Sequence, residues 1–121
     1  MLIFKICHDE EWKLAEAAGR YDGTAKDKED GFLHFSSADQ LIGTLEKWYA
    51  AADDLLLVAV DGDALGGALK WEPSRDGALF PHLYAALPLS AVTWTGAIGR
   101  DPEGGFVLPN PQGLTALSPD A

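Results

Sequence analysis

The sequence predicts an α+β fold, with a mixed, mostly antiparallel sheet and two main helices. The patterns along the chain run strand, helix, strand, helix and then mostly strands. The second half lacks helical periodicity, which disfavours a doubly wound fold. The 121 residues, 47% of them hydrophobic, are enough for one compact core. We expect a single domain over residues 1–108 and a tail over 109–121 that frays, because it is rich in Pro, Gly and Ser.

The first elements follow from apolar patterning and capping residues. Residues 2–7 are an apolar, strand-like run without the basic leader of a signal peptide. Asp9 can cap a helix that runs to about Ala18, and Gly19 can close it. Residues 20–30 are polar and rich in Asp, Lys and Gly, so we expect a loop there.

A second strand and the clearest helix come next. Residues 31–35 form a short strand, and Ser37 and Gln40 have the spacing of a capping box. Apolar residues then recur at helical intervals, namely Leu41, Leu45, Trp48, Tyr49 and Ala52. Residues 55–60 are an unbroken apolar run, which is typical of a central strand.

The remaining elements are strands. Strand-like pieces occupy residues 68–72, 79–84 and 91–97. The Gly- and Pro-containing segment 98–105 predicts a hairpin connection, which leads into a final strand over 106–108.

Charge and cysteine content limit the partners and the compartment. The 19 acidic and 9 basic side chains give a net charge of −10, which repels phosphate backbones and argues against DNA and RNA as partners. No apolar run approaches the roughly 20 residues that span a bilayer, so we expect no membrane association. Cys7 stands alone and cannot form an internal disulfide, which favours a reducing cytoplasm. No cation or helix start lies near it, so it is expected to be a buried structural thiol.

His34 is the first candidate site residue. It lies on the predicted strand just before the Ser-capped helix, where it can bond a ligand ribose or phosphate. The alternative is a core histidine that is bonded to a backbone carbonyl. Ser36 and Ser37 at the helix start can hold an anion through their hydroxyls and the exposed amides.

A second group of candidates follows in the strand-rich half. His82 and Tyr84 share one strand face and can line a cleft, although a half-buried strand edge explains them equally well. Glu72 follows Trp71, so we expect partial desolvation to raise the pKa of its carboxyl group. It can act as a base or stabilise a developing cation, or it can simply pair with Arg75. Arg75 can clamp a phosphate or lie solvated in its turn.

Other chemistries have weaker support. His34 and His82 could share a metal with a carboxylate, but no short ligand spacing supports a metal site. No Walker or Rossmann glycine pattern is present. Three tryptophans are expected in the core, namely Trp12, Trp48 and Trp94.

In combination these residues resemble a known family. The resemblance rests on the opening Ile-Phe-Lys-Ile strand, on Trp12, Ala15, Gly19 and Tyr21, and on Asp30-Gly31-Phe32-Leu33-His34-Phe35-Ser36 with Gln40. It continues through Leu65, Trp71-Glu72-Pro73, Phe80-Pro81-His82-Leu83-Tyr84, Ala91-Val92 and Gly105-Phe106. This pattern is similar to that of the bacterial domain-of-unknown-function 952 family over residues 2–109.

That resemblance implies a fold and a chemistry. The family has been grouped with the ADP-ribosyltransferase superfamily, which implies an ADP-ribosyltransferase-like fold and NAD as the cofactor. By this resemblance His34 contacts the NAD ribose, His82 fills a second polar position, and Glu72 is a third catalytic candidate. Three hypotheses follow: an NAD-binding ADP-ribosyltransferase-like enzyme, a non-catalytic module that binds a nucleotide-like small molecule, and a structural domain.

Overall fold

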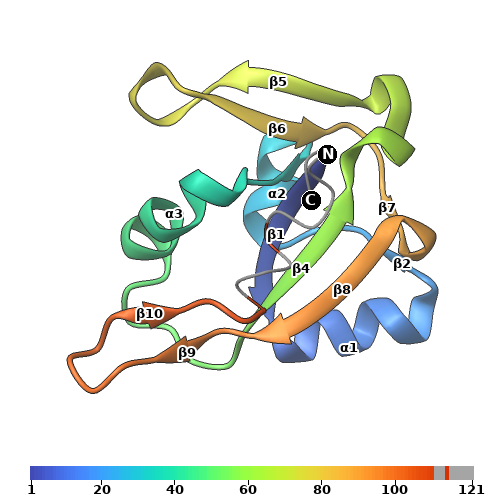
Figure 1. The fold of residues 1–121 in the computed structure, drawn as a ribbon. Coiled ribbons are helices and arrows are strands. Elements are labelled where there is room, and N and C mark those ends of the chain that lie inside the picture. The colour runs from blue at the N-terminus through green and yellow to red at the C-terminus, as the bar shows by residue number, and fades with distance from the viewer. Residues whose placement is uncertain (111–113, 115–121) are drawn as a thin grey trace.

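Two antiparallel three-stranded sheets form the body of the protein in a computed structural model, which describes residues 1–110 and 114 (Figure 1). The first sheet has the order β1-β4-β8, with β1 (Leu2–His8), β4 (Leu55–Asp61) and β8 (Val92–Ala97). The second has the order β3-β6-β5, with β3 (Leu33–His34), β6 (Leu79–Leu83) and β5 (Leu69–Pro73). The unbroken apolar run of β4 fits its central place, because a central strand is covered on both faces.

The two longer helices cover opposite faces of the first sheet. Helix α1 (Asp9–Ala18) contributes Trp12 and Ala15 to one apolar cluster, and α3 (Leu41–Trp48) contributes Leu41 and Leu45 to the other. Gly19 closes α1 with a φ of 82°, a left-handed conformation that glycine adopts without strain. The expectation of two main helices on an α+β body is therefore confirmed.

Strand β1 supplies side chains to both clusters because its residues alternate between the sheet faces. Ile3 and Cys7 face the α1 side, and Phe4 and Ile6 face the α3 side. By the same alternation Lys5 falls on the face of Ile3 and Cys7, where it is 3% exposed. Burial raises the pKa of the Cys7 thiol to about 12, so this side chain is a structural thiol and not a nucleophile.

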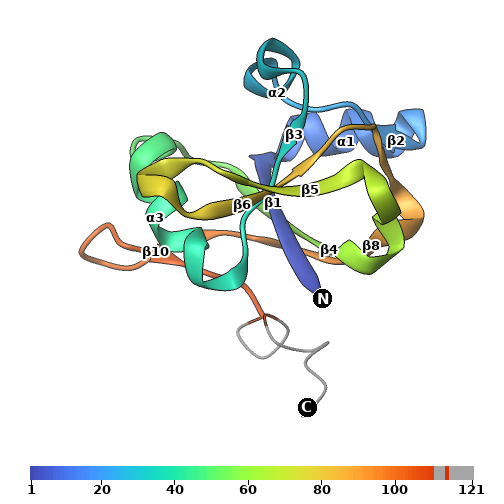
Figure 2. The ribbon, with the colours of Figure 1, turned by 90° about the horizontal axis from the view of Figure 1, so that it is seen from above.

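The two sheets are joined at one bridge. The amides of Phe4 and Ser36 each donate to the other residue's carbonyl at 2.8 Å. The β5–β6 hairpin crosses over β1, and its tip lies over α3 in both views (Figure 1 and Figure 2). The space between hairpin, β1 and α3 is therefore walled by segments far apart in the sequence.

Several expectations need correction. Residues 20–30 are not a loop, because they hold β2 (Arg20–Tyr21), which pairs with β7 (Leu87–Pro88), and helix α2 (Ala25–Asp30). Strand pairing among the described residues is antiparallel throughout, not mixed.

The second predicted helix also differs in its bounds. It begins as a 3-10 turn over Ala38–Gln40, with the expected capping box at Ser37, and α3 ends at Trp48 instead of Ala52. Further 3-10 turns cover Gly62–Ala68, Arg75–Gly77 and Leu89–Ala91.

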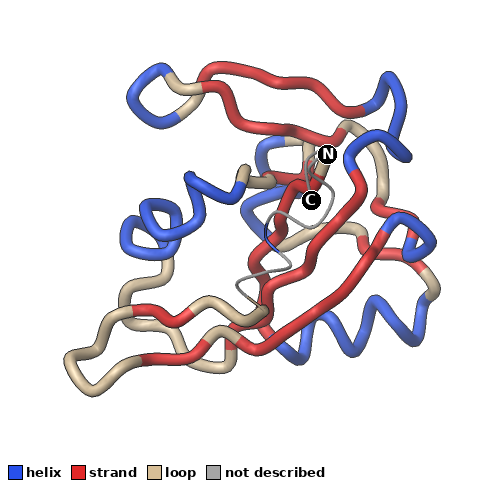
Figure 3. The backbone as a smooth tube through the Cα atoms, in the orientation of Figure 1, coloured by secondary structure: helices blue, strands red, loops and turns tan. Residues whose placement is uncertain are grey.

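The C-terminal part of the described chain is a small hairpin. Strands β9 (Gly99–Arg100) and β10 (Phe106–Val107) are joined by a loop (Figure 3), as the Gly and Pro content predicts. The predicted fraying of the tail falls mainly on residues 111–113 and 115–121, outside the described residues. No helix in the described part of the chain is both long and apolar enough to cross a membrane.

Candidate functional site

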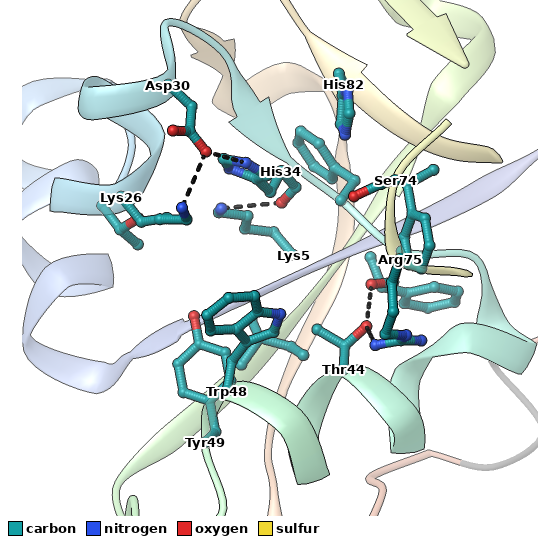
Figure 4. Close-up of a pocket in the computed structure, with 16 residues that line it drawn as sticks. Lys5, Lys26, Asp30, His34, Thr44, Trp48, Tyr49, Ser74, Arg75 and His82 are labelled. Carbon is teal, nitrogen blue, oxygen red and sulfur yellow. Dashed lines mark hydrogen bonds and ion pairs between the residues drawn. The ribbon is translucent and has the colours of Figure 1, made fainter. Parts of the chain in front are cut away.

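A pocket of about 340 Å³ lies between β1, α2, β3, α3 and the β5–β6 hairpin (Figure 4). Its size is in the range of small-molecule sites. Its lining has three parts: a charged end with histidines and charged groups, a hydroxyl end with hydroxyls and a guanidinium, and an aromatic end. Each part is built from a different set of elements.

The charged end is organised by Asp27, which is almost fully buried on α2. Its Oδ2 accepts from Lys5 Nζ at 2.6 Å and from the Thr24 amide at 2.9 Å. Its Oδ1 accepts from the His34 amide at 3.0 Å and lies 2.6 Å from His34 Nδ1. Burial alone would raise the pKa of this carboxyl group, but the His34 hydrogen bond and the Lys5 charge outweigh it and hold the pKa below the ordinary value.

Lys5 completes this buried ion pair. Its ammonium also donates to the His34 carbonyl at 2.9 Å, so it ties β1 to β3. Burial lowers the pKa of Lys5, and the Asp27 carboxylate opposes that effect. Because Asp27 accepts several hydrogen bonds as a carboxylate, we assign the pair as ionised.

His34 is held at both ring nitrogens. Its Nδ1 contacts Asp27, and its Nε2 lies 2.9 Å from Asp30 Oδ2. A carboxylate only accepts hydrogen bonds, so both contacts are hydrogen bonds when the ring carries both protons. The ring therefore binds two carboxylates and not the backbone carbonyl of the alternative expectation.

His82 is held at one nitrogen only. Its Nδ1 lies 2.9 Å from Glu72 Oε1, which also accepts from the Tyr84 hydroxyl at 2.6 Å. Its Nε2 has no hydrogen-bond partner among residues 1–110 and 114. The Phe32 ring stacks on the imidazole at 4.1 Å between centroids, and the His34 ring meets it edge-on at 5.5 Å. The histidine is thus fixed in place with one nitrogen uncommitted.

The predicted pKa shift of Glu72 is wrong in direction. The hydrogen bonds from Tyr84 and His82 lower the pKa of this carboxyl group, and its partial exposure leaves little desolvation to oppose them. The same carboxylate raises the pKa of the Tyr84 hydroxyl. Glu72 and Arg75 form no ion pair, because the guanidinium turns towards α3.

The hydroxyl end joins the hairpin tip to α3. Arg75 Nη1 lies 3.2 Å from Thr44 Oγ1, and Thr44 Oγ1 lies 3.2 Å from Ser36 Oγ. The guanidinium also lies over the Phe80 ring, 5.0 Å from its centroid. Gly43 permits this approach, because a Cβ there would lie 2.9 Å from Arg75 Nη2. A cation and several hydroxyls therefore converge on one corner of the pocket (Figure 4).

The aromatic end is formed by Trp48 and Tyr49 at the end of α3. Trp48 is 60% exposed, so the expectation that it lies in the core is wrong, whereas Trp12 is buried as expected. The ammonium of Lys26 lies 5.6 Å from the Trp48 ring centroid and 3.4 Å from Asp30 Oδ2.

The predicted site residues divide into two groups. His34, His82, Ser36 and Arg75 line the pocket. Glu72 and Tyr84 do not line it, and they contact His82 or each other behind the pocket wall. Ser37 lies outside the lining, where its hydroxyl donates to Asp39 and its amide to Gln40.

Sequence reasoning missed the acidic partners of His34 and the buried lysine. Thr24 and Asp27 have capping-box spacing, which would have revealed α2 and its carboxylates. Lys5 interrupts an apolar strand, which signals a buried ion that needs a partner. Within the described residues no group of histidine, cysteine and carboxylate side chains is arranged to hold a metal ion.

Comparison with known proteins gives the family. The model of the family described as "Protein of unknown function (DUF952)" matches residues 6–95. The chain belongs to the DUF952 family. No match was found among curated proteins. These findings bear out the family resemblance, while the link to ADP-ribosyltransferases stays a prediction.

Solved structures of one bacterial protein are also similar. The crystal structure of protein CC0527 from Caulobacter crescentus is 43% identical, with a TM-score of 0.86, and the match covers 95% of this chain and 99% of that chain. The solution NMR structure of CC0527 is 45% identical, with a TM-score of 0.77 and coverage of 86% and 90%. The likeness extends over nearly the whole chain and therefore includes the elements that build the pocket.

Proposed function

We propose that this DUF952 protein binds a phosphate-bearing, nucleotide-like small molecule in the pocket, with NAD as the first candidate. The observation that carries the proposal is the convergence of cations, hydroxyls and aromatic rings on one cavity in a chain of net charge −10. The site offers a small anion the Arg75 guanidinium, which has no carboxylate partner among the described residues, whereas Lys5 and Lys26 are paired with Asp27 and Asp30. It also excludes a long polyanion, because the acidic surface around it repels one.

The phosphate would lie against Arg75, Thr44 and Ser36. A guanidinium forms two parallel hydrogen bonds to phosphate oxygens, and hydroxyls donate further ones. Arg75 already faces this corner through Thr44, so little side-chain ordering is required on binding. In this proposal the anion lies at the hairpin tip, and Ser36 is the contribution of the segment before α3.

His82 is the group suited to proton transfer. Because Glu72 accepts from Nδ1, the neutral ring carries its proton there, which leaves the Nε2 lone pair to accept one. Glu72 would then stabilise the imidazolium that forms, as an orienting carboxylate does for other catalytic histidines. Glu72 therefore acts through His82, and the His34 ring lies edge-on beside that imidazole.

The reaction that the family resemblance implies is ADP-ribosyl transfer from NAD. The bond between the ribose carbon and the nicotinamide nitrogen breaks, nicotinamide leaves with both electrons, and positive charge develops on the ribose. An acceptor hydroxyl attacks that carbon and gives its proton to His82 Nε2. The aromatic rings of the pocket supply surfaces for the nicotinamide or the adenine.

The second candidate is a non-catalytic module that binds the same ligand. Glycosidic cleavage typically places a carboxylate against the sugar. Among the described residues Asp30 is the one carboxylate on the lining, and it is already paired with His34 and Lys26. Because Asp30 is engaged in these ion pairs, the site is better suited to binding the ligand than to cleaving it.

Ligand-induced stabilisation tests the proposal. NAD or ADP-ribose should raise the melting temperature, because a ligand that binds only the native state stabilises it. Arg75→Ala should weaken binding about tenfold or more, since it removes a charged hydrogen-bond donor. Arg20→Ala is the matched control, because Arg20 pairs with Asp22 on the surface away from the pocket. The absence of any shift with either nucleotide would overturn the proposal.

Product analysis then separates the two candidates. Incubation with NAD should release nicotinamide if the protein is a transferase, and His82→Gln should abolish that release while binding persists. Binding without nicotinamide release supports the module instead.

A further inference from the structure

One face of α3 carries a hydroxyl and an indole one turn apart. Thr44 and Trp48 are four residues apart on this helix, which places them on the same side with a rise of about 6 Å between them. Both line the pocket (Figure 4). The helix therefore connects the guanidinium corner directly to the aromatic end.

Trp48 is not needed for the packing of α3. The helix is anchored by Leu41 and Leu45, each fully buried in the cluster beneath it. Trp48 remains 60% exposed and, with Tyr49, forms the aromatic end of the pocket wall. A tryptophan of this exposure within a cavity lining is a surface for a ligand and not a core residue.

The charges around the indole indicate what the ligand carries. The ammonium groups of Lys26 and Lys47 lie over the Trp48 ring, 5.6 Å and 5.3 Å from its centroid, and Lys26 also pairs with Asp30 at 3.4 Å. A planar ring that stacks on the indole takes the place of an ammonium group there, and an anionic ligand keeps the displaced cation nearby, so such a ligand gains from both charge and stacking. The lining thus matches a compound with an aromatic ring at one end and phosphate at the other.

We propose that Trp48 is the stacking platform for the base of the ligand, while Arg75 and Thr44 hold its phosphate. This inference rests on the proposed function and fixes the orientation of the ligand within the same pocket. The ribose of a nucleoside 5′-phosphate spans the one-turn interval between the two groups. The sugar then lies across the lining between Thr44 and Trp48.

Stacking also determines the specificity. Every base has a π-face, so a single indole accepts purines and nicotinamide alike without reading their edges. The affinity should therefore depend strongly on whether the ligand has a base and only weakly on which base it is. Ribose 5-phosphate, which lacks the base, should bind about tenfold more weakly than AMP.

The test compares AMP with ribose 5-phosphate by calorimetry on three variants. Trp48→Ala should weaken AMP binding about tenfold and leave ribose 5-phosphate unchanged, because only AMP has a base to lose. Trp48→Phe should restore most of the AMP affinity, since it retains an aromatic face. Trp71→Ala is the matched control, because Trp71 is also exposed but lies on β5 outside the lining.

The outcomes distinguish this inference from the proposed function. If AMP binds and Trp48→Ala leaves its affinity unchanged, or weakens both ligands equally, the stacking role is wrong while the phosphate site survives. If neither AMP, NAD nor ribose 5-phosphate binds the unaltered protein, the proposed function and the stacking role fall together.

Discussion

Asp27 links three segments through a single carboxylate. It receives hydrogen bonds from Lys5 on β1, from His34 on β3 and from the Thr24 amide at the start of its own helix. A buried charge is costly unless it is paired, and here each charge has its partner. The consequence is that removal of one member leaves the others uncompensated.

Asp27→Asn should therefore destabilise the fold strongly. The amide keeps the shape but leaves the Lys5 ammonium buried without a counter-ion, which costs about 3–5 kcal/mol in comparable buried pairs. Urea unfolding of the variant gives the change in the free energy of unfolding. Asp22→Asn is the control, because Asp22 pairs with Arg20 on the surface and should cost less than about 1 kcal/mol.

The same carboxylate predicts acid sensitivity. The folded-state pKa of Asp27 is below the unfolded value of about 3.9, so the unfolded chain binds its proton first as pH falls. Its stabilisation is present above that unfolded value and is lost as pH falls towards the folded pKa. Unfolding free energies of the unaltered protein should decline more steeply between pH 5 and pH 3 than those of Asp27→Asn. Parallel declines would contradict this assignment.

At this scale the sequence identified the histidines but not their partners. His34 and His82 were candidates because polar rings among apolar residues need compensation. Glu72 was placed beside Trp71 by sequence, and its real neighbours across the sheet, His82 and Tyr84, were not adjacent in the chain. Its pKa shift was therefore predicted with the wrong sign, because the hydrogen bonds that determine it are non-local.

Helix α2 shows why one element escaped prediction. It has six residues without an apolar face, so hydrophobic periodicity does not reveal it. It is held by the Thr24 capping box and by the contacts of Asp27 with β1 and β3. Elements with an apolar repeat, such as β4 and α1, were placed within a residue or two, because the repeat itself determines how they pack.

Helix α3 offers a test of the anion site that does not remove any charge. Gly43→Ala should leave stability equal or raise it, since alanine gains up to about 1 kcal/mol over glycine inside a helix. The new methyl group would displace the Arg75 guanidinium, because it would lie 2.9 Å from Nη2. AMP or NAD affinity should fall while the melting temperature of the free protein does not.

Gly67→Ala is the control for that substitution. Its added methyl group meets nothing within 4 Å, so it should leave the position of Arg75 and the ligand affinity unchanged. Equal affinities of the Gly43 and Gly67 variants would show that Arg75 does not hold the ligand.

On the scale of the whole molecule, the net charge of the chain and the charge offered by the hydroxyl end of the pocket have opposite signs. The net charge of −10 indicates repulsion of polyanions, yet Arg75, a cation without a carboxylate partner among the described residues, lines the pocket near the hydroxyls of Thr44 and Ser36. The fold class, most strands and four lining residues (His34, Ser36, Arg75 and His82) could be predicted from the sequence, whereas the arrangement of the pocket walls could not. The pocket depends on which segments the sheet topology brings together, and Arg75 and Thr44 are 31 residues apart.

The two hydrogen bonds between Phe4 and Ser36 hold two walls of the cavity together, because both residues line it and each belongs to a different wall. Separation of these walls requires both bonds to break, together with the bond from Lys5 to the His34 carbonyl. Hydrogen–deuterium exchange at these two amides should therefore be concerted, and NAD should slow both. The Phe106 amide in the β9–β10 hairpin, which contributes no residue to the lining, should be unaffected. Exchange at these two backbone amides would then report how often the cavity opens.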